Sequence, residues 1–183
     1  MGLLKLEYLP RYTYQDYTCW EGNWELIEGI PCAMSPAPMI YHQNISGEIS
    51  TLLREAFINC QYCKELFAVD WKIDDETVVC PDNLVICHNE TNEKYLTKAP
   101  KIIFEILSKS TAKKDKTIKF ELYQQEGVEY YVIVDGSEKV AKIYELKDGK
   151  YIKMLNATDE VVEFDITNCG KVLFNFKKIW GNK

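Results

Sequence analysis

The pattern of apolar and polar positions predicts strands and helices along most of the 183 residues. Apolar side chains recur at helical spacing over 41–57, which predicts one long helix. A Glu28-Gly29 turn is typical of a hairpin, and Pro81 favours an edge or a bulge in the strand that contains it. The strands expected in this half of the chain cover 24–29, 30–34, 67–73 and 78–87.

The middle of the chain predicts a β-α-β unit. Residues 102–107 are apolar on both faces, as in a central strand that is covered on both sides. A helix is expected to follow, from an N-cap at Ser110 or Thr111 to about residue 126. A second buried strand is then expected over 129–135. Short links between a strand, a helix and a strand favour parallel pairing of the two strands.

The remaining sequence predicts smaller elements around this unit. A short helical arm is expected over 1–18, and a hairpin is expected from strands over 140–146 and 151–155. The tail over 161–180 predicts a short strand followed by an apolar, helical end. Together the elements predict an α/β or α+β fold, a mixed β-sheet flanked by α-helices. Because no linker or repeat interrupts the pattern, residues 1–183 are expected to form a single domain.

The charge and the cysteines limit the function classes. The formal net charge is −6, so the whole surface is a poor non-specific binder of nucleic acid. Any DNA contact must then use a local basic patch, a bound metal or both. No apolar stretch is long enough for a signal peptide or a membrane span. The seven cysteines are therefore expected to be free thiols in a reducing, cytoplasmic compartment.

Glu105 is a carboxylate inside the most apolar strand of the chain. Strand side chains alternate faces, and Glu105 shares its face with Ile103 and Leu107. An unpaired buried charge costs several kcal/mol, so a metal, a basic side chain or backbone N–H groups should compensate it. A buried salt bridge, or a strand end that lets the carboxylate reach water, explains the position equally well.

Asp82 follows Pro81 at the start of the preceding apolar run. A Pro-Asp pair alone is most often a turn. If the two strands fold back as antiparallel neighbours, however, Asp82 and Glu105 come to lie on one face. Two carboxylates, a backbone carbonyl and water suit an octahedral Mg²⁺ or Mn²⁺ ion.

The expected helix after Glu105 places Asp115, Lys119 and Tyr123 four residues apart on one face. An exposed ion pair between Asp115 and Lys119 is the simpler interpretation. The functional interpretation is a lysine that reaches a phosphate or an attacking water.

Lysines are concentrated near the start of the same helix, and a solvated helix face explains most such clusters. Contact with a phosphate backbone is the sharper hypothesis. The candidates for nucleic-acid binding are Lys109, Lys113, Lys114 and Lys116.

Two further features carry weaker signals. Cys60 and Cys63 form a single C-x-x-C pair without a second pair at zinc spacing, so two buried thiols are favoured over a zinc or redox site. His42, at the start of the first long helix, is more often a cap or surface residue than a catalytic group. Phosphate-loop, dinucleotide and nucleophile-elbow motifs are absent.

Several segments taken together resemble the bacterial putative restriction endonuclease family, formerly a domain of unknown function, within the PD-(D/E)XK nuclease superfamily. The resemblance spans roughly residues 24–151 and implies a restriction-endonuclease-like core and Mg²⁺-dependent cleavage of DNA. The segments that carry it are Trp24-Glu-Leu-Ile-Glu-Gly29, Met34-Ser-Pro-Ala-Pro38, His42, Pro81-Asp82, Glu105-Ile-Leu-Ser108, Ser110-Thr111, Asp115, Lys119, Tyr123, Gly127-Val-Glu-Tyr-Tyr131 and Val134-Asp135.

By position in these motifs, Asp82 resembles the first acidic residue of the superfamily and Glu105 the second. The usual lysine would fall at Leu107, so Lys119 on the following helix takes its place. The expected metal ligands are Asp82, Glu105 and the carbonyl of Ile106. The accessory candidates are Glu48, His42, Asp115 and Tyr123.

The leading hypothesis is thus a Mg²⁺-dependent endonuclease in which Lys119 orients or deprotonates a water, or steadies the transition state. A catalytically inactive module for binding or assembly, on the same fold, is the alternative that the acidic charge favours. A thiol enzyme using Cys60 and Cys63 ranks below both. Nuclease relatives often work as dimers, so a homodimer is also expected.

Overall fold

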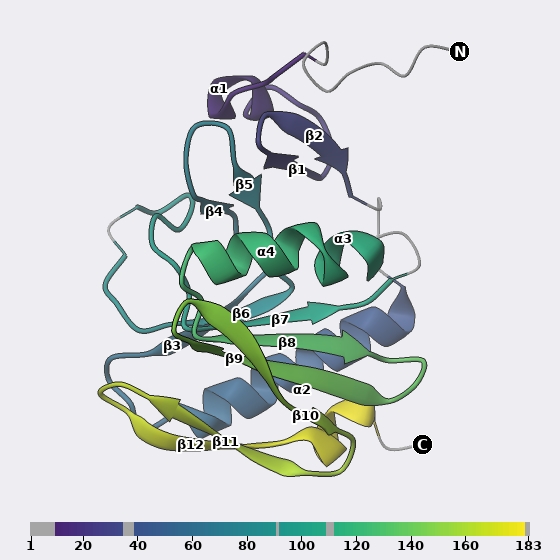
Figure 1. Ribbon diagram of the computed structural model, residues 1–183, viewed down its shortest axis with the longest axis vertical. Coiled ribbons are helices and arrows are strands. Elements are labelled where there is room, and N and C mark those ends of the chain that lie inside the picture. The colour runs from purple at the N-terminus through teal and green to yellow at the C-terminus, as the bar shows by residue number, and fades with distance from the viewer. Residues whose placement is uncertain (1–9, 35–38, 91, 109–111, 182–183) are drawn as a thin grey trace.

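The computed structural model describes residues 10–34, 39–90, 92–108 and 112–181. In this part of the chain, three β-sheets lie in layers, with a six-stranded mixed sheet in the centre (Figure 1). The strand order of the central sheet is β10-β9-β8-β7-β6-β3. Its strands are β3 (Lys64–Phe67), β6 (Asn83–Ile86), β7 (Ile102–Ile106), β8 (Tyr130–Asp135), β9 (Val140–Lys147) and β10 (Lys150–Ala157).

The predicted β-α-β unit is confirmed at the centre of this sheet. Strands β7 and β8 pair in parallel, whereas the other pairs of the sheet are antiparallel. The connection between them passes through α3 (Ala112–Lys116) and α4 (Ile118–Gln125). All five residues of β7 are buried, as the apolar run predicts for a strand covered on both faces.

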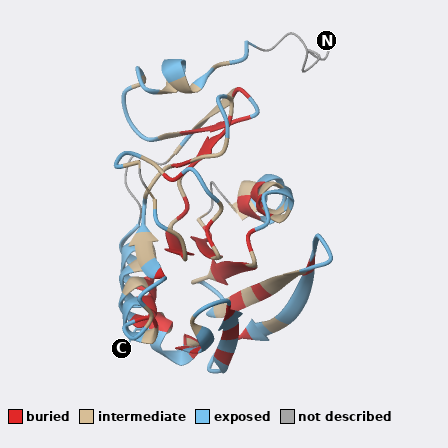
Figure 2. Cartoon of the chain, turned by 90° about the vertical axis from the view of Figure 1, so that its left-hand side faces the viewer, coloured by how far each residue is buried: buried red, intermediate tan, exposed pale blue. Residues whose placement is uncertain are grey.

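Helices cover the two faces of the central sheet. The helix α2 (Ile40–Ala56), which confirms the helix predicted over 41–57, lies on one face, and α4 lies on the other (Figures 1 and 2). Each face has its own apolar core. The core on the α2 side includes Ile49 and Phe104, and the core on the α4 side includes Ile103 and Tyr123. Alternation along β7 explains why neighbouring residues belong to different cores.

A smaller antiparallel sheet lies above the α4 side, beside the helical arm α1 (Tyr14–Tyr17). The predicted hairpin at its edge is confirmed, and Glu28 and Gly29 turn the chain with φ angles of 49° and 74°. The strands of this sheet, in spatial order, are β2 (Ile30–Ala33), β1 (Trp24–Ile27), β5 (Val78–Val79) and β4 (Trp71–Lys72).

Two of the predicted strands are wrong as single elements. The strand predicted over 67–73 divides into β3 and β4, because Ala68 adopts a left-handed conformation with φ of 47°. The strand predicted over 78–87 divides into β5 and β6 around Pro81, which has no N–H for a sheet. In both cases the chain leaves one sheet and enters the other.

The helix predicted after β7 is also interrupted. Thr117 has φ of −128° and ψ of −79°, and it separates α3 from α4. Asp115 and Lys119 therefore belong to two short helices instead of one continuous face. The predicted N-cap candidates Ser110 and Thr111, and the predicted phosphate contact Lys109, lie outside the described residues.

The tail predicted over 161–180 is partly confirmed. It forms a second hairpin, β11 (Val161–Ile166) and β12 (Gly170–Asn175), before the 3₁₀ helix η2 (Phe176–Trp180). Burial alternates along β11, and its inner side chains pack on the α2 face of the central sheet. No helix among the described residues has both the length and the apolar character needed to cross a membrane.

The prediction of free thiols is wrong for four cysteines in the structure. Cys60 is bonded to Cys169 and Cys63 to Cys87, across 109 and 24 residues of sequence. The C-x-x-C pair is thus not closed on itself, and no local signal indicates its distant partners. The free cysteines are Cys19, Cys32 and Cys80.

Removal of the Phe104 ring should weaken the fold strongly. This fully buried ring lies beside Phe164, Phe174 and Phe176 and joins the tail to the central sheet. We expect Phe104→Ala to lower the free energy of unfolding by about 3–5 kcal/mol, measured by urea denaturation. The control Leu173→Ala, on the exposed face of β12, should change it by about 0.5 kcal/mol or less. Equal effects of the two substitutions would contradict the packing described.

Candidate active site

A cavity of about 670 Å³ opens where the small sheet and the central sheet diverge. Its wall includes β1, the chain crossing at residues 80–82, the end of β7, the start of α2 and parts of α3 and α4. All three of the predicted catalytic residues line it, namely Asp82, Glu105 and Lys119. The predicted meeting of these segments is therefore found in the structure.

Asp82 lies directly before β6, at the point where the chain enters the central sheet. Because β6 and β7 are antiparallel neighbours, Asp82 comes beside the end of β7. The backbone N–H of Ile106 donates to Asp82 Oδ2 over 2.7 Å, and His42 Nε2 lies 3.2 Å from the same oxygen. Among the described residues, Asp82 Oδ1 has no hydrogen-bonding partner.

His42 is brought to the site by the first turn of α2. Burial lowers the pKa of its imidazole, but the hydrogen bond and the negative charge of Asp82, together with the backbone of Ile106, outweigh that effect and raise the pKa. His42 is thus an ion-pair partner of Asp82 in the cavity wall, and not the cap or surface residue that its sequence context favoured.

Glu105 is almost fully buried within β7. Its Oε1 accepts hydrogen bonds from Lys119 Nζ over 2.8 Å and from Tyr123 Oη over 2.7 Å. Burial raises the pKa of this carboxyl well above its usual range, the charge of Lys119 opposes the rise, and the nearby carboxylates add to it. Among the described residues, Glu105 Oε2 has no hydrogen-bonding partner.

Lys119 contacts several carboxylates and is itself buried, with an exposed fraction of 3%. Its Nζ lies 2.7 Å from Glu25 Oε1, 2.8 Å from Glu105 Oε1 and 3.7 Å from Asp115 Oδ1. Burial alone would lower the pKa of Lys119, but Glu105 and Glu25 outweigh it and hold the pKa well above its usual range. The ammonium group therefore stays charged.

Glu25 is the site residue that the sequence reasoning missed. This fully buried carboxylate on β1 accepts from the backbone N–H of Cys80 over 3.1 Å and pairs with both Lys114 and Lys119. Burial raises its pKa, but the two lysines outweigh that effect and lower it. The available signal was an acid between Trp24 and Leu26, the same signal that identified Glu105.

The other predicted residues are divided between the cavity and the surface. Asp115 is buried and lines the cavity, and Tyr123 lies behind Glu105. Glu48 is exposed and is not part of the cavity wall.

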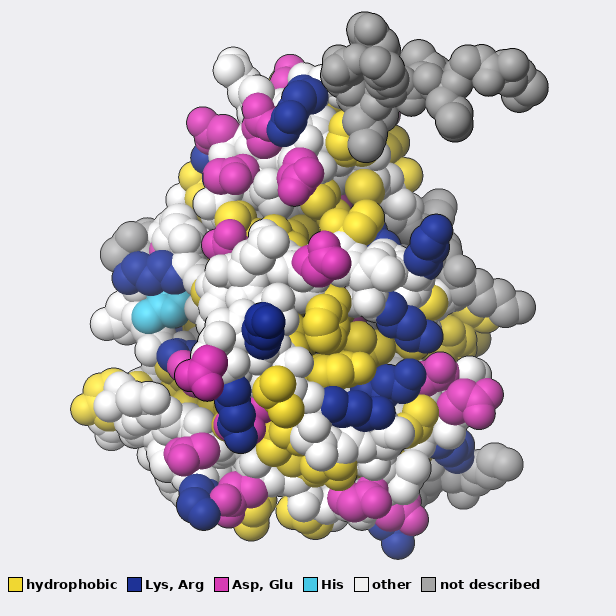
Figure 3. Space-filling model, in the orientation of Figure 1, with side chains coloured by type: hydrophobic (Ala, Val, Ile, Leu, Met, Phe, Trp, Pro, Cys, Tyr) yellow, Lys and Arg dark blue, Asp and Glu magenta, His cyan; other side chains and the backbone are white. Residues whose placement is uncertain are grey.

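The described lysines of α3 also take different positions. Lys114 turns inward to Glu25, whereas Lys113 and Lys116 are exposed. In Figure 3, basic side chains lie at and below the position of α3, while acidic side chains predominate at the upper end of this face.

Negative charge exceeds positive charge around the cavity. The carboxylates in its wall belong to Glu25, Asp70, Asp82, Glu105 and Asp115, whereas the lysines there are Lys114 and Lys119. Among the described residues, no three Asp, Glu or His side chains bring their ligand atoms within 4.8 Å of one another. The wall thus offers several carboxylates around one cavity, which suits a cation that keeps several waters.

Comparisons with known proteins identify the fold and the family of the chain. A crystal structure of a putative nuclease of family DUF820 from Anabaena variabilis superposes with a TM-score of 0.74, and the match covers 92% of this chain and 97% of that chain. At 16% identity, this likeness shows the shared fold. No curated protein matches the chain. The profile of the Uma2 family, described as putative restriction endonucleases, matches residues 14–167, and the chain therefore belongs to that family.

Proposed function

We propose that the protein is a Mg²⁺-dependent endonuclease that hydrolyses phosphodiester bonds of DNA. The observation that carries this proposal is that Asp82 and Glu105 line one cavity, each with one anchored oxygen and one oxygen without a partner among the described residues. Membership of a family described as putative restriction endonucleases supports it.

The donor set fits a hard divalent cation. The unpartnered carboxylate oxygens of Asp82 and Glu105, with the carbonyl of Ile106, would hold Mg²⁺, which typically takes one or two carboxylates and completes its shell with water. The surplus of negative charge in the wall favours the same ion. When bound, Mg²⁺ supplies a water of lowered pKa and stabilises negative charge on the phosphate.

The chain's own groups hold these ligands in place. The N–H of Ile106 and the imidazole of His42 orient Asp82, while Tyr123 and Lys119 fix Glu105. Because its pKa is raised, Lys119 is suited to stabilise developing negative charge as a fixed cation, and it is a poor proton acceptor. Of the roles expected for Lys119, this electrostatic one is the most consistent with its surroundings.

The DNA backbone would contact the exposed lysines of α3. Lys113 and Lys116 lie on the same short helix as Lys114 and Asp115, which line the cavity. Contacts of this kind bind phosphates without reading sequence. They would place a phosphodiester at the cavity despite the negative charge of the whole chain.

The substitution Asp82→Asn should abolish cleavage. The amide oxygen can still accept from Ile106, so the fold is kept, but the charged ligand is lost. We expect Mg²⁺-dependent nicking of plasmid DNA to fall by more than the roughly 10–100-fold that follows loss of a residue supporting a metal ligand. The control Glu121→Gln removes an exposed carboxylate from α4 and should cleave at the wild-type rate.

Undiminished Mg²⁺-dependent cleavage by Asp82→Asn would overturn the site. If the wild-type protein neither cleaves DNA nor binds Mn²⁺ at millimolar concentration in calorimetry, the inactive binding or assembly module is favoured instead.

The substitution Lys119→Met should destabilise the protein as well as inactivate it. It leaves Glu25 and Glu105 buried without their shared cation, and breaking such a pair lowers the free energy of unfolding by about 3–5 kcal/mol. Urea denaturation measures this loss. Adding Glu25→Gln to Lys119→Met should recover part of it, because one buried charge is removed. A single variant as stable as wild type would contradict the buried network.

Replacement of the exposed lysines should reduce DNA affinity without sequence preference. For Lys113→Ala with Lys116→Ala, we expect weaker binding of labelled duplexes and a salt dependence that is shallower by about 0.9 per lost phosphate contact. Fluorescence anisotropy over a range of salt concentrations measures both. The control is Lys178→Ala, because Lys178 is an exposed lysine of η2, which packs on the core of the α2 side. It should leave the affinity and its salt dependence unchanged. Unaltered salt dependence in the double variant would exclude these lysines as phosphate contacts.

A further inference from the structure

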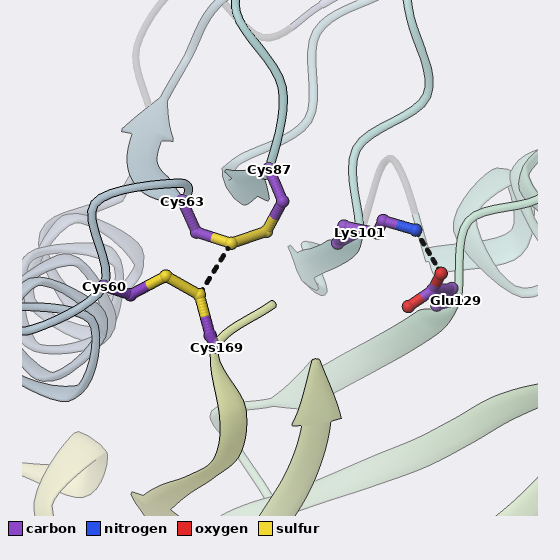
Figure 4. The surroundings of a disulfide bond; sticks show 6 residues. All are labelled: Cys60, Cys63, Cys87, Lys101, Glu129 and Cys169. Atoms are coloured by element: carbon purple, nitrogen blue, oxygen red, sulfur yellow. Dashed lines mark hydrogen bonds and ion pairs between the residues drawn. A yellow bond between two sulfur atoms is a disulfide. The ribbon is translucent and has the colours of Figure 1, made fainter. Parts of the chain in front are cut away.

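Four cysteines from separate parts of the chain meet at one point, away from the cavity (Figure 4). Cys60 follows α2, Cys63 precedes β3, Cys87 follows β6, and Cys169 lies in the β11–β12 turn. The two disulfides also touch each other, since Cys169 Sγ lies 3.1 Å from Cys63 Sγ.

The sulfur atoms lie close enough together to surround a single metal ion. Those of Cys60, Cys63 and Cys169 lie within 4.8 Å of one another, and Cys87 is bonded to Cys63. A tetrahedral zinc site with Zn–S bonds of about 2.3 Å places its sulfurs roughly 3.8 Å apart. Two disulfides that serve only as separate links have no need of such contact, whereas four ligands of one metal require it.

The fold presents the four side chains from fixed positions. Lys64 pairs with Ile86 at the end of the β3–β6 ladder, so Cys63 and Cys87 face each other one residue further on. The backbone N–H of Cys60 donates a hydrogen bond to the carbonyl of Phe57, and that of Cys169 donates to the carbonyl of Ile166. Regular elements and tight turns thus position every sulfur before any metal binds.

We propose that Cys60, Cys63, Cys87 and Cys169 form a tetrathiolate site for one structural Zn²⁺ ion, and that the two disulfides are its metal-free, oxidised form. A thiol reductant delivers two electrons and two protons to each disulfide, which yields four cysteine thiols and two oxidised reductant disulfides. Binding of Zn²⁺ then displaces the four thiol protons to water and leaves a ZnS₄ centre with two net negative charges.

A second surface hollow gives access to this cluster. It is lined by Cys60, Cys169 and Lys171, so both the metal and a reductant can reach the sulfurs from solvent. Amide side chains also line it, and N–H donors of this kind stabilise bound thiolates. These amides belong to Asn59, Gln61 and Asn168.

The metal would join three parts of the fold. A two-stranded hairpin such as β11–β12 is marginally stable alone, and Cys169 would tie it to the central sheet and to the end of α2. The 17 residues of α2 separate this cluster from the cavity, where His42 lies in the first turn. The zinc is therefore structural, and it acts on the cavity only through the placement of α2.

Metal analysis of the full chain, purified with a thiol reductant, tests this proposal. We expect one zinc and no iron per chain by elemental analysis. Cys169→Ser and Cys87→Ser should each lose at least half of the bound zinc, while Cys19→Ser, at an exposed cysteine outside the cluster, should keep one equivalent. A reduced chain with free thiols and no zinc, or a chain that binds iron instead, would overturn the assignment.

Wild-type protein provides a second measurement that no folding defect can obscure. Addition of one equivalent of Co²⁺ to the reduced, metal-free chain should produce thiolate charge-transfer absorption and the bands of a tetrahedral ion. An oxidant should then release one equivalent of zinc from the zinc form, detected with a chromogenic chelator, as the Cys60–Cys169 and Cys63–Cys87 bridges form. Formation of both bridges without metal release, or an octahedral Co²⁺ spectrum, would contradict the proposal.

Discussion

One buried ammonium group holds the candidate site together. Lys119 on α4 binds Glu25 on β1 and Glu105 on β7, so a single side chain joins the small sheet, the central sheet and the helix between them. Charges removed from water are tolerated only when partners and hydrogen bonds surround them. This requirement fixes the relative positions of the three elements, because a shift of any one would leave a buried charge without its partner.

The cavity follows from the same constraint. Lys119 joins the two sheets through Glu25 and Glu105, and the cavity lies beside the crossing of the chain from β5 to β6. Pro81 ends the pairing of β5, and Asp82 therefore enters the gap as the first residue before β6. The carboxylate of Asp82 reaches the N–H of Ile106, which places it beside Glu105 on the neighbouring strand.

Short-range patterns predict a large part of this structure. Periodicity identified α2, β7, β8 and the β9–β10 hairpin, and an acid in an apolar strand identified Glu105. The same patterns failed where the backbone changes direction between sheets, at Ala68 and Pro81, because strand-like residues continue on both sides of each break. Glu25 stands out as an acid between apolar residues, but no local pattern indicates that its partner is Lys119, or that the partner of Cys60 is Cys169.

Anomalous diffraction from crystals grown with Mn²⁺ would show whether Asp82 and Glu105 bind a metal, since it locates the ion independently of any activity. We expect one peak in the cavity, in contact with a carboxylate oxygen of Asp82 and another of Glu105, with Lys119 still bound to Glu105. An empty cavity at saturating Mn²⁺, or a peak that contacts neither carboxylate, would contradict this expectation.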